Sequence, residues 1–293
     1  MNQIKKIAVT TDTNSGLLPL KYDNQGLFVL PMPFIIDGEV MLESVTLSRE
    51  IFYENLRADK NISTSQPSVT EVTEFWSEIL KEYDEIVHIP TSSLLSNACS
   101  TAQSLAKDFD GKVFVVDNLR IAEPLAQSAF DAVKLRDSGK SAEEIKEYLE
   151  KTASDYELFV SLDSMKHLKK GGRVSPAVAT IGSMLKLRPV LKLASGKLEK
   201  FAIPRTMQKA SELIKTAIAE DLKGKYKEYA DNGEMRICLV YGEDKTATDA
   251  LKVELEKLFP SVPVLDCAPM SLSIACHVGP NVIAFGLVRV VNA

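Results

Sequence analysis

The sequence predicts an α/β protein with two domains, an N-terminal doubly wound parallel sheet and a C-terminal mixed sheet. Short apolar runs rich in β-branched residues alternate with amphipathic helical patterns through the first half of the chain. The second half changes to strands joined by short turns. A chain of 293 residues is long for one core, so we expect domains at residues 1–157 and 158–293.

The expected strands of the first domain are short and apolar, as buried parallel strands are. They cover residues 7–10, 86–89 and 113–116. Capping-box patterns at residues 68–71 and 141–144 each predict the start of a helix, and the second helix is expected to end near residue 154. Residues 27–35 and 40–45 are expected to form an inserted hairpin, because Asp37-Gly38 between them favours a tight turn.

The second domain is predicted from turn and cap signals between apolar runs. We expect a short helix over residues 164–170 that Gly171-Gly172 ends, another helix beginning at Ser175-Pro176, and a long helix from Met207 onward. The expected strands are residues 158–160, 190–193, 198–203, 237–240, 262–267 and 282–290.

Composition narrows the function classes. A net charge of -5 argues against a nucleic-acid partner, which usually requires a basic face. No apolar run approaches the roughly 20 residues that span a bilayer, and the run after Lys5 and Lys6 is too short for a signal peptide, so we expect a cytoplasmic protein without stable membrane insertion. The four cysteines form no CxxC pair, which favours free thiols in a reducing compartment.

Three polar segments are candidates for one binding site. Hydroxyl residues gather at residues 63–68 and 91–96, each before an expected helix start, where backbone N–H groups and hydroxyls suit a carboxylate or phosphate. Asp12 follows the first strand, where doubly wound sheets bind ligands, and is either a functional carboxylate or an ordinary turn former. His277 stands in a loop before glycine and proline, whereas His88 is expected in the core and His167 on the surface.

Catalytic alternatives remain open at this point. Ser93, His277 and Asp12 supply the residue types of a serine esterase or phosphatase, but no G-x-S-x-G elbow is present. A phosphosugar- or nucleotide-binding protein is a third possibility, although the P-loop and G-x-G-x-x-G patterns are absent. Arg173 and Arg205 are either solvated surface charges or contacts to an anionic group and a docking partner.

Seven segments, in this order, resemble the DegV family of bacterial fatty-acid-binding proteins. They span nearly the whole chain and are residues 9–13, 63–68, 92–96, 168–174, 187–191, 205–206 and 277–279. The resemblance implies two α/β domains with a long-chain fatty acid in an apolar tunnel between them. It also implies a non-catalytic protein that takes no metal and no cofactor other than the bound fatty acid.

The resemblance also assigns roles to residues. It implies that the carboxylate is held by Ser63 or Thr64, by Ser92 or Ser93, and by His277, with Arg173 in support. It further implies a separate fatty acid kinase, which phosphorylates the bound carboxylate to an acyl phosphate for phospholipid synthesis and which docks at Arg205. The candidate tunnel residues follow Ser175-Pro176 and are Ile181, Met184 and Leu185.

The sequence departs from the family pattern at a few positions. Leu94 and Asn97 stand where the family usually has glycine, and Ala98 stands where it has a hydroxyl residue. Asn281 replaces part of a glycine-rich continuation after the histidine. These departures concern the shape of the head-group loop and the approach of the kinase, and they leave the serines and His277 in place.

Overall fold

The computed structural model describes residues 5–172 and 187–292, and the chain divides into two compact units between Ser154 and Asp155. Residues before this division form unit 1, and residues after it form unit 2. The predicted helix start at Ser175-Pro176, together with Arg173, Ile181, Met184 and Leu185, lies outside the described residues. None of the helices in the described part of the chain is long and apolar enough to cross a bilayer.

The main sheet of unit 1 is parallel, as predicted. Its strand order is β2-β1-β6-β7, with bounds β1 Ile7–Asp12, β2 Leu27–Leu30, β6 Glu85–Ile89 and β7 Val113–Val115. Every residue of β1 and β6 is buried, as expected for central strands covered on both faces. The chain continues from β1 to β2 on one side, and β6 lies on the other. The topological switch point therefore lies between the carboxyl ends of β1 and β6.

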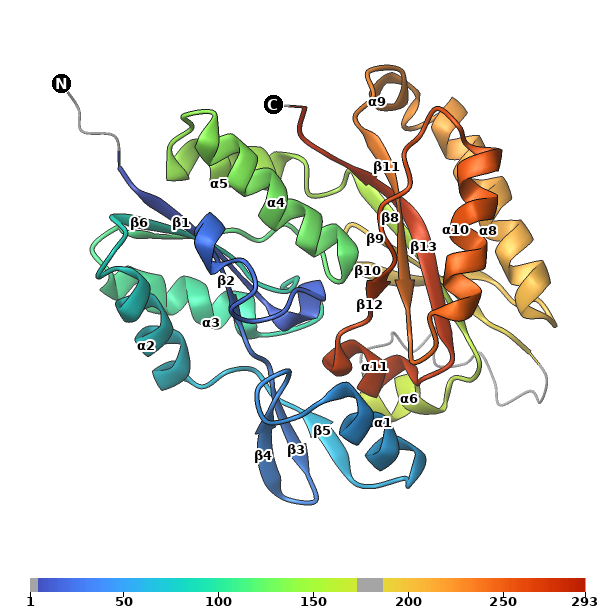
Figure 1. The fold of residues 1–293 in the computed structure, drawn as a ribbon, viewed down its shortest axis with the longest axis horizontal. Coiled ribbons are helices and arrows are strands. Elements are labelled where there is room, and N and C mark those ends of the chain that lie inside the picture. Colours follow the sequence, from blue (N-terminus) through green and yellow to red (C-terminus); the bar gives the residue numbers. More distant parts are fainter. Residues whose placement is uncertain (1–4, 173–186, 293) are drawn as a thin grey trace. The chain divides into compact units, whose positions relative to one another are not determined.

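Helices cover both faces of this sheet (Figure 1). On one face α2 (Val69–Ile79) and α3 (Ala98–Leu105) pack Trp76 and Cys99 against the strands. On the other face α4 (Glu123–Asp137) and α5 (Ala142–Lys151) contact β1, β6 and β7. Both predicted capping boxes are confirmed, because Ser68 pairs with Glu71 and Ser141 pairs with Glu144 in reciprocal hydrogen bonds. Unit 1 also has short 3₁₀ turns, η1 Thr13–Ser15, η2 Asp23–Gln25 and η3 Ala106–Asp108.

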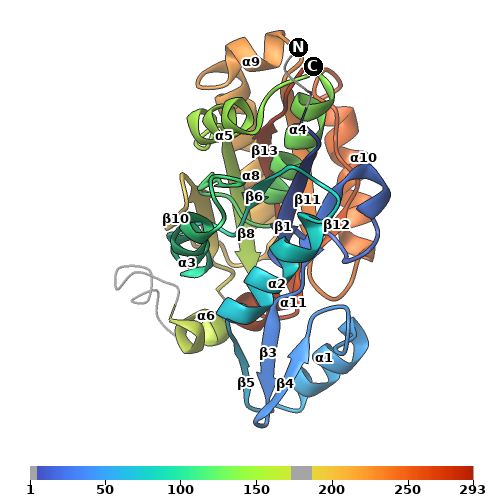
Figure 2. The ribbon, with the colours of Figure 1, turned by 90° about the vertical axis from the view of Figure 1, so that its left-hand side faces the viewer.

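A small antiparallel sheet is inserted between β2 and α2. Its order is β4-β3-β5, with bounds β3 Pro33–Ile36, β4 Glu39–Leu42 and β5 Ile62–Thr64. It lies beside α1 (Arg49–Arg57) (Figure 2). The rings of Phe34 and Phe52 meet edge to face at 5.7 Å between this sheet and α1. Asp37 and Gly38 both have positive φ, 50° and 92°, which confirms the predicted tight turn.

The predicted hairpin was too long at its first strand. Residues 27–30 form β2 and pair in parallel with β1, from Val9 to Asp12, instead of joining the hairpin. Leu27 and Leu30 are buried there, so their apolar side chains are covered by the main sheet. An apolar β-branched run predicts a strand, but does not specify the sheet in which the strand pairs.

Unit 2 contains a mixed sheet, as predicted. The order is β10-β9-β8-β13-β11-β12, and the β11–β12 pair is parallel while the others are antiparallel. The bounds are β8 Tyr156–Leu162, β9 Val190–Ala194, β10 Lys197–Ala202, β11 Met235–Tyr241, β12 Ala268–Pro269 and β13 Val282–Arg289. The expected strand at 262–267 was wrong, because Val264 forms an isolated bridge with Ile237 beside Pro263, which has no N–H to donate.

Helices α8 (Met207–Lys223) and α10 (Thr246–Leu258) cover one face of this sheet (Figure 1). Their buried residues Ile214, Ile218 and Leu255 pack on Phe159 and Phe285 in a single apolar cluster. The remaining described helices are α6 Lys166–Gly171, α9 Lys227–Asp231 and α11 Leu272–Val278. The end of α6 follows the prediction, since Gly172 adopts a left-handed conformation with φ of 66°.

Candidate functional site

Asp12, the last residue of β1, connects the loops that follow β1 and β6. Its buried carboxylate accepts hydrogen bonds from the Thr91 N–H at 2.8 Å, from the Thr91 hydroxyl at 2.9 Å and from the Asn14 N–H at 2.9 Å. The Asn14 side-chain amide also donates to the Thr91 hydroxyl at 2.8 Å. These contacts support the structural interpretation of Asp12, because its two oxygens are engaged in shaping the switch point.

The influences on the pKa of Asp12 agree with a structural role in holding the loops after β1 and β6. Burial raises the pKa of its carboxyl, and the hydrogen bonds from Thr91 and Asn14 act in the opposite direction by stabilising the charged form. Among the described residues, no group of three or more His, Cys, Asp or Glu side chains is placed to hold a metal ion. The polar atoms at this end of the sheet are engaged in hydrogen bonds among Asp12, Asn14 and Thr91.

The loop after β6 presents Ser92 and Ser93 in different environments. Ser92 is buried, its N–H donates to the Arg120 carbonyl at 3.0 Å, and its hydroxyl accepts from the Leu94 N–H at 3.2 Å. Ser93 is exposed, and its N–H donates to the Asp117 carboxylate at 3.3 Å. Ser92 thus helps to hold the loop, while Ser93 offers its hydroxyl at the surface of unit 1.

Ser63 and Thr64 lie on β5, a strand that the sequence did not predict. Ser63 pairs with Ile35 and is exposed, whereas Thr64 pairs with Phe34 and is half-buried. The segment after β5 reaches α3, because the Gln66 side-chain amide donates to the Thr101 hydroxyl at 3.3 Å.

A small cavity in unit 1 shows that this segment and the switch point are neighbours. The cavity has a volume of about 10 Å³, room for about one water, and is lined by Pro67, Pro90, Thr101 and Asp12 among others. Pro67 belongs to the predicted hydroxyl segment, and Pro90 directly precedes the second one. Unit 1 therefore brings the first two predicted segments to one end of its parallel sheet.

The predicted residues of unit 2 lie near the α6–α11 pair and at the start of α8. His277 was expected in a loop, but it lies in the last turn of α11, where it is half-buried and its ring lies against Gly171 at the end of α6. Arg205 is exposed and directly precedes Thr206, the N-cap of α8. His167 was predicted on the surface, but it is half-buried and packs against Gly279.

The predicted core histidine of unit 1 is confirmed. His88 is buried on β6, where its Nδ1 lies 2.8 Å from the Thr10 hydroxyl and its ring meets Trp76 edge to face at 5.1 Å. Burial lowers the pKa of His88 to about 3, so the ring is neutral near pH 7. His88 is therefore core structure.

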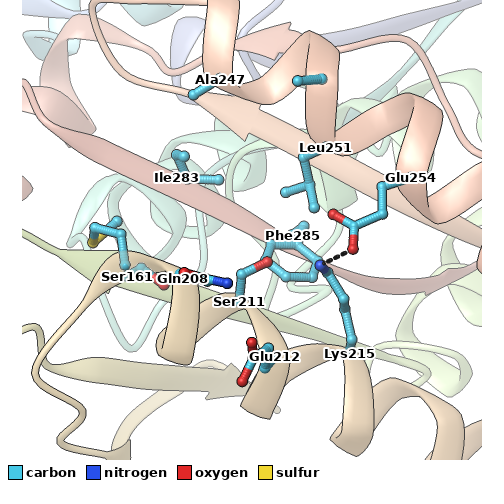
Figure 3. Close-up of a pocket in the computed structure, with 12 residues that line it drawn as sticks. Ser161, Gln208, Ser211, Glu212, Lys215, Ala247, Leu251, Glu254, Ile283 and Phe285 are labelled. Atoms are coloured by element: carbon cyan, nitrogen blue, oxygen red, sulfur yellow. Dashed lines mark hydrogen bonds and ion pairs between the residues drawn. The ribbon is translucent and has the colours of Figure 1, made fainter.

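Unit 2 also contains a cavity of about 360 Å³ between α8 and α10 (Figure 3). Its apolar lining comes from Leu251 on α10 and from Ile283 and Phe285 on β13. Polar side chains line the helix side, where Lys215 of α8 and Glu254 of α10 form an ion pair of 2.5 Å. The volume falls in the range of about 300–1,000 Å³ that is typical of small-molecule pockets.

Two residues that shape these sites have a role that no sequence pattern indicates. Arg120 is fully buried and donates to the Ser128 hydroxyl at 3.0 Å and to the Thr152 carbonyl at 2.7 Å. Its neighbours suggest only a polar loop, so no sequence signal marks it. Gly171 was recognised only as a helix terminator, although its contact with His277 is a second reason for a glycine there.

Unit 1 has the features of a ligand-binding doubly wound domain, with hydroxyl-bearing loops at its switch point. Both units fall within one known class of proteins, because the family model "Uncharacterised protein, DegV family" matches residues 6–290. The chain belongs to the DegV family.

Relatives by sequence match over most or nearly all of the chain. A DegV domain-containing protein of Streptococcus pneumoniae is 28% identical over 290 residues, which is 98% of this chain and 100% of the relative. A DegV domain-containing protein of Staphylococcus aureus is 30% identical over 215 residues, which is 73% of this chain and 77% of the relative.

Solved structures extend the likeness to the fold. A fatty-acid-binding DegV family protein from Thermus thermophilus has a TM-score of 0.84 and 27% identity, covering 97% of this chain and 100% of that one. The fatty-acid-binding DegV family protein from Streptococcus agalactiae has a TM-score of 0.82 and 26% identity, covering 98% and 100%.

Proposed function

We propose that this protein binds a long-chain fatty acid and presents its carboxylate to a separate fatty acid kinase, without catalysing a reaction itself. The observation that carries the proposal is the likeness, over 97% of the chain at 27% identity, to a fatty-acid-binding DegV family protein. The hydroxyl-bearing loops at the switch point of unit 1 support it, because they offer donors where this fold class binds ligands.

The head group is assigned to uncharged donors. Ser93 and Ser63 are exposed and Thr64 is half-buried, so their hydroxyls are available to a carboxylate, whereas Ser92 is buried and helps to hold the loop that presents Ser93. Desolvation of an unpaired carboxylate costs several kcal/mol, which such hydrogen bonds offset. Hydroxyls leave the negative charge on the carboxylate, and this charge is what a carboxylate needs as the nucleophile in phosphoryl transfer.

We assign His277 to the same head group as a further hydrogen-bond donor. On the ground of the sequence resemblance, the proposal also includes Arg173 near the head group and Ile181, Met184 and Leu185 along the hydrocarbon chain. A double-mutant cycle between Ser93→Ala and His277→Ala tests whether unit 1 and unit 2 act on one carboxylate. Coupling of the two losses in palmitate affinity supports this assignment. Strictly additive losses would contradict it.

Affinity is expected to come from the hydrocarbon chain. About 15 methylenes at about 0.8 kcal/mol each give a gross gain of about 12 kcal/mol, from which the loss of translational and chain freedom is subtracted. The head-group hydroxyls then mainly orient the ligand.

Non-catalytic presentation is favoured over hydrolysis by the state of Asp12. A serine hydrolase needs a carboxylate that orients its histidine, whereas both oxygens of Asp12 accept hydrogen bonds from Thr91. The exposed Arg205 is proposed as a contact for the kinase. A bound fatty acid is the sole ligand that the proposal includes, with no metal or cofactor.

Native mass spectrometry of the purified full-length protein tests the proposal. We expect a co-purifying long-chain fatty acid and restored binding of palmitate after delipidation. Ser93→Ala is expected to weaken palmitate binding on the order of tenfold, the loss of one or two hydrogen bonds to a charged group. Ser104→Ala, an exposed serine on α3, is the matched control. Failure of the delipidated protein to bind any fatty acid would remove the proposal.

The two alternative functions, a serine esterase and a phosphate-binding protein, predict different experimental results. Turnover of a chromogenic ester that Ser93→Ala abolishes would replace the proposal with an esterase. Thermal stabilisation by phosphate esters but not by palmitate or oleate would replace it with a phosphate-ligand protein. Binding of palmitate without ester turnover supports the carrier.

A further inference from the structure

Helices α6 and α11 pack against each other through two contacts between a histidine and a glycine. A Cβ placed on Gly171 would lie 3.1 Å from Cγ and 3.2 Å from Cε1 of His277, and closer still to Nδ1. A Cβ placed on Gly279 would lie 2.9 Å from Cδ2 of His167. Each imidazole therefore occupies space that any side chain on the opposite glycine would need.

The glycine at position 171 has no explanation in its own backbone. Gly172 caps α6 with φ of 66°, and a Cβ on it would meet no atom of the described residues within 4 Å. Gly171 lies within the helix, does not have a positive φ, and so occupies a position where alanine is the better helix former. What requires glycine there is the adjacent ring of His277.

The backbone around α11 is held in place on both sides of His277. On one side the Ser271 hydroxyl caps α11 by accepting a hydrogen bond from the Ile274 N–H at 3.2 Å. On the other side the Gly242 N–H donates to the Val282 carbonyl at 3.0 Å. A side chain at Gly171 would therefore displace the imidazole more readily than the helix that carries it.

We propose that Gly171 is a positioning residue for His277, because its lack of a side chain sets where the imidazole lies and how it meets the ligand head group. The inference rests on the proposed function for its consequence in binding. The contact itself is independent of that function. The His167–Gly279 contact supports the same arrangement by fixing the approach of α6 to the end of α11.

The test compares two ligands that differ in the head group. Dissociation constants are measured for palmitate and for hexadecanol, which has the same chain without the carboxylate, on the delipidated full-length protein. We expect Gly171→Ala to weaken palmitate binding on the order of tenfold, as the loss of a charge-assisted hydrogen bond would, and to change hexadecanol binding by less than about twofold. The same substitution in a His277→Ala background should cause no further loss of palmitate affinity.

Gly172→Ala is the matched control. It strains the same helix end through its left-handed backbone but does not approach His277, so it should leave the palmitate-to-hexadecanol ratio unchanged. Two-dimensional ¹H–¹⁵N spectra of the imidazoles give a readout that needs no ligand. The His277 ring signals should shift in Gly171→Ala and remain in place in Gly172→Ala.

The outcomes separate the inference from the proposed function. Unshifted His277 signals in folded Gly171→Ala, or an equal loss of palmitate affinity with and without His277, would overturn the positioning role. Absence of palmitate binding by the wild-type protein would instead overturn the proposed function. In that case the imidazole spectra alone decide whether Gly171 places His277.

Discussion

Glu157 is a buried carboxylate in unit 2, and we predict that it makes the protein less stable as the pH rises. Its side chain is fully buried on β8 and forms an ion pair of 2.5 Å with Lys192 of β9, which also lies 3.7 Å from Asp221 of α8. Burial and then the neighbouring Asp221 raise the pKa of Glu157 from 4.5 to about 7, while Lys192 opposes the shift only in part.

The sign follows from proton linkage. A raised pKa means that the folded state binds this proton more tightly than the unfolded chain does. The stabilising contribution is therefore complete below pH 4.5 and is lost as the pH rises through about 7. At about 1.4 kcal/mol per pH unit, the difference between the two pKa values corresponds to about 3 kcal/mol of unfolding free energy.

Urea unfolding of wild type and Glu157→Gln at pH 5 and pH 8 measures this effect. The amide resembles the protonated acid and does not titrate, so the variant should gain about 2.5 kcal/mol relative to wild type between the two pH values, because pH 5 already lies above the unfolded-state pKa of 4.5. Glu234→Gln, which removes a partly exposed carboxylate from its ion pair with Arg289, controls for the loss of an ion-paired glutamate in the same unit. An unchanged difference between wild type and Glu157→Gln, or a relative gain by wild type at pH 8, would refute the reasoning.

Three further predictions concern unit 1 and the start of α8. Asp12→Ala leaves the buried N–H groups of Thr91 and Asn14 without their acceptor, so we expect a loss of about 2–4 kcal/mol in calorimetry and weaker palmitate binding. Thr206→Ala removes the N-cap that accepts the Lys209 N–H at 3.1 Å, and urea unfolding should show a loss of about 1 kcal/mol. Arg205→Ala should slow acyl phosphate formation by a partner kinase on the order of tenfold while palmitate affinity stays within about twofold.

Each of these three has its own contradicting outcome. Asp12→Asn keeps one acceptor and should lose less stability than Asp12→Ala, so equal losses would show that the acceptor geometry is unimportant. Thr206→Ser keeps the cap, and equal destabilisation by serine and alanine would contradict capping. If Arg205→Ala weakens palmitate binding as much as it slows the kinase reaction, the docking role is wrong.

Sequence patterns correctly predicted the strands, helix starts and turns that depend on interactions between neighbouring residues. The strand beginning at Ile7 and the two capping boxes were correct, because burial pattern, β-branching and caps act within a few residues. The Asp37-Gly38 turn was correct for the same reason. Signals of this range cannot assign a strand to a sheet, which is why residues 27–30 were placed in the wrong one.

The sequence showed which residue types could form the candidate site, but it did not show where they lie. Hydroxyls in two segments predicted an anion site; residues 91–96 follow β6 of the parallel sheet, whereas Ser63 and Thr64 lie on β5 of the small antiparallel sheet. That Ser92 is buried and Ser93 exposed depends on bonds to Arg120 and Asp117, which are distant in sequence. β5 was missed because three residues containing Ser63 and Thr64 have no strand signature until they pair with Phe34.

The sequence by itself determined the fold class, the parallel and mixed character of the two sheets, and the residue types available to bind an anion. Only the tertiary structure decided that Asp12 engages Thr91, that Glu157 is buried beside Lys192, and that Gly171 faces His277. The physical reason is the separation along the chain between the residues that interact. Periodicity, caps and turns are properties of neighbouring residues, whereas desolvation and steric exclusion depend on residues that meet only when the chain has folded.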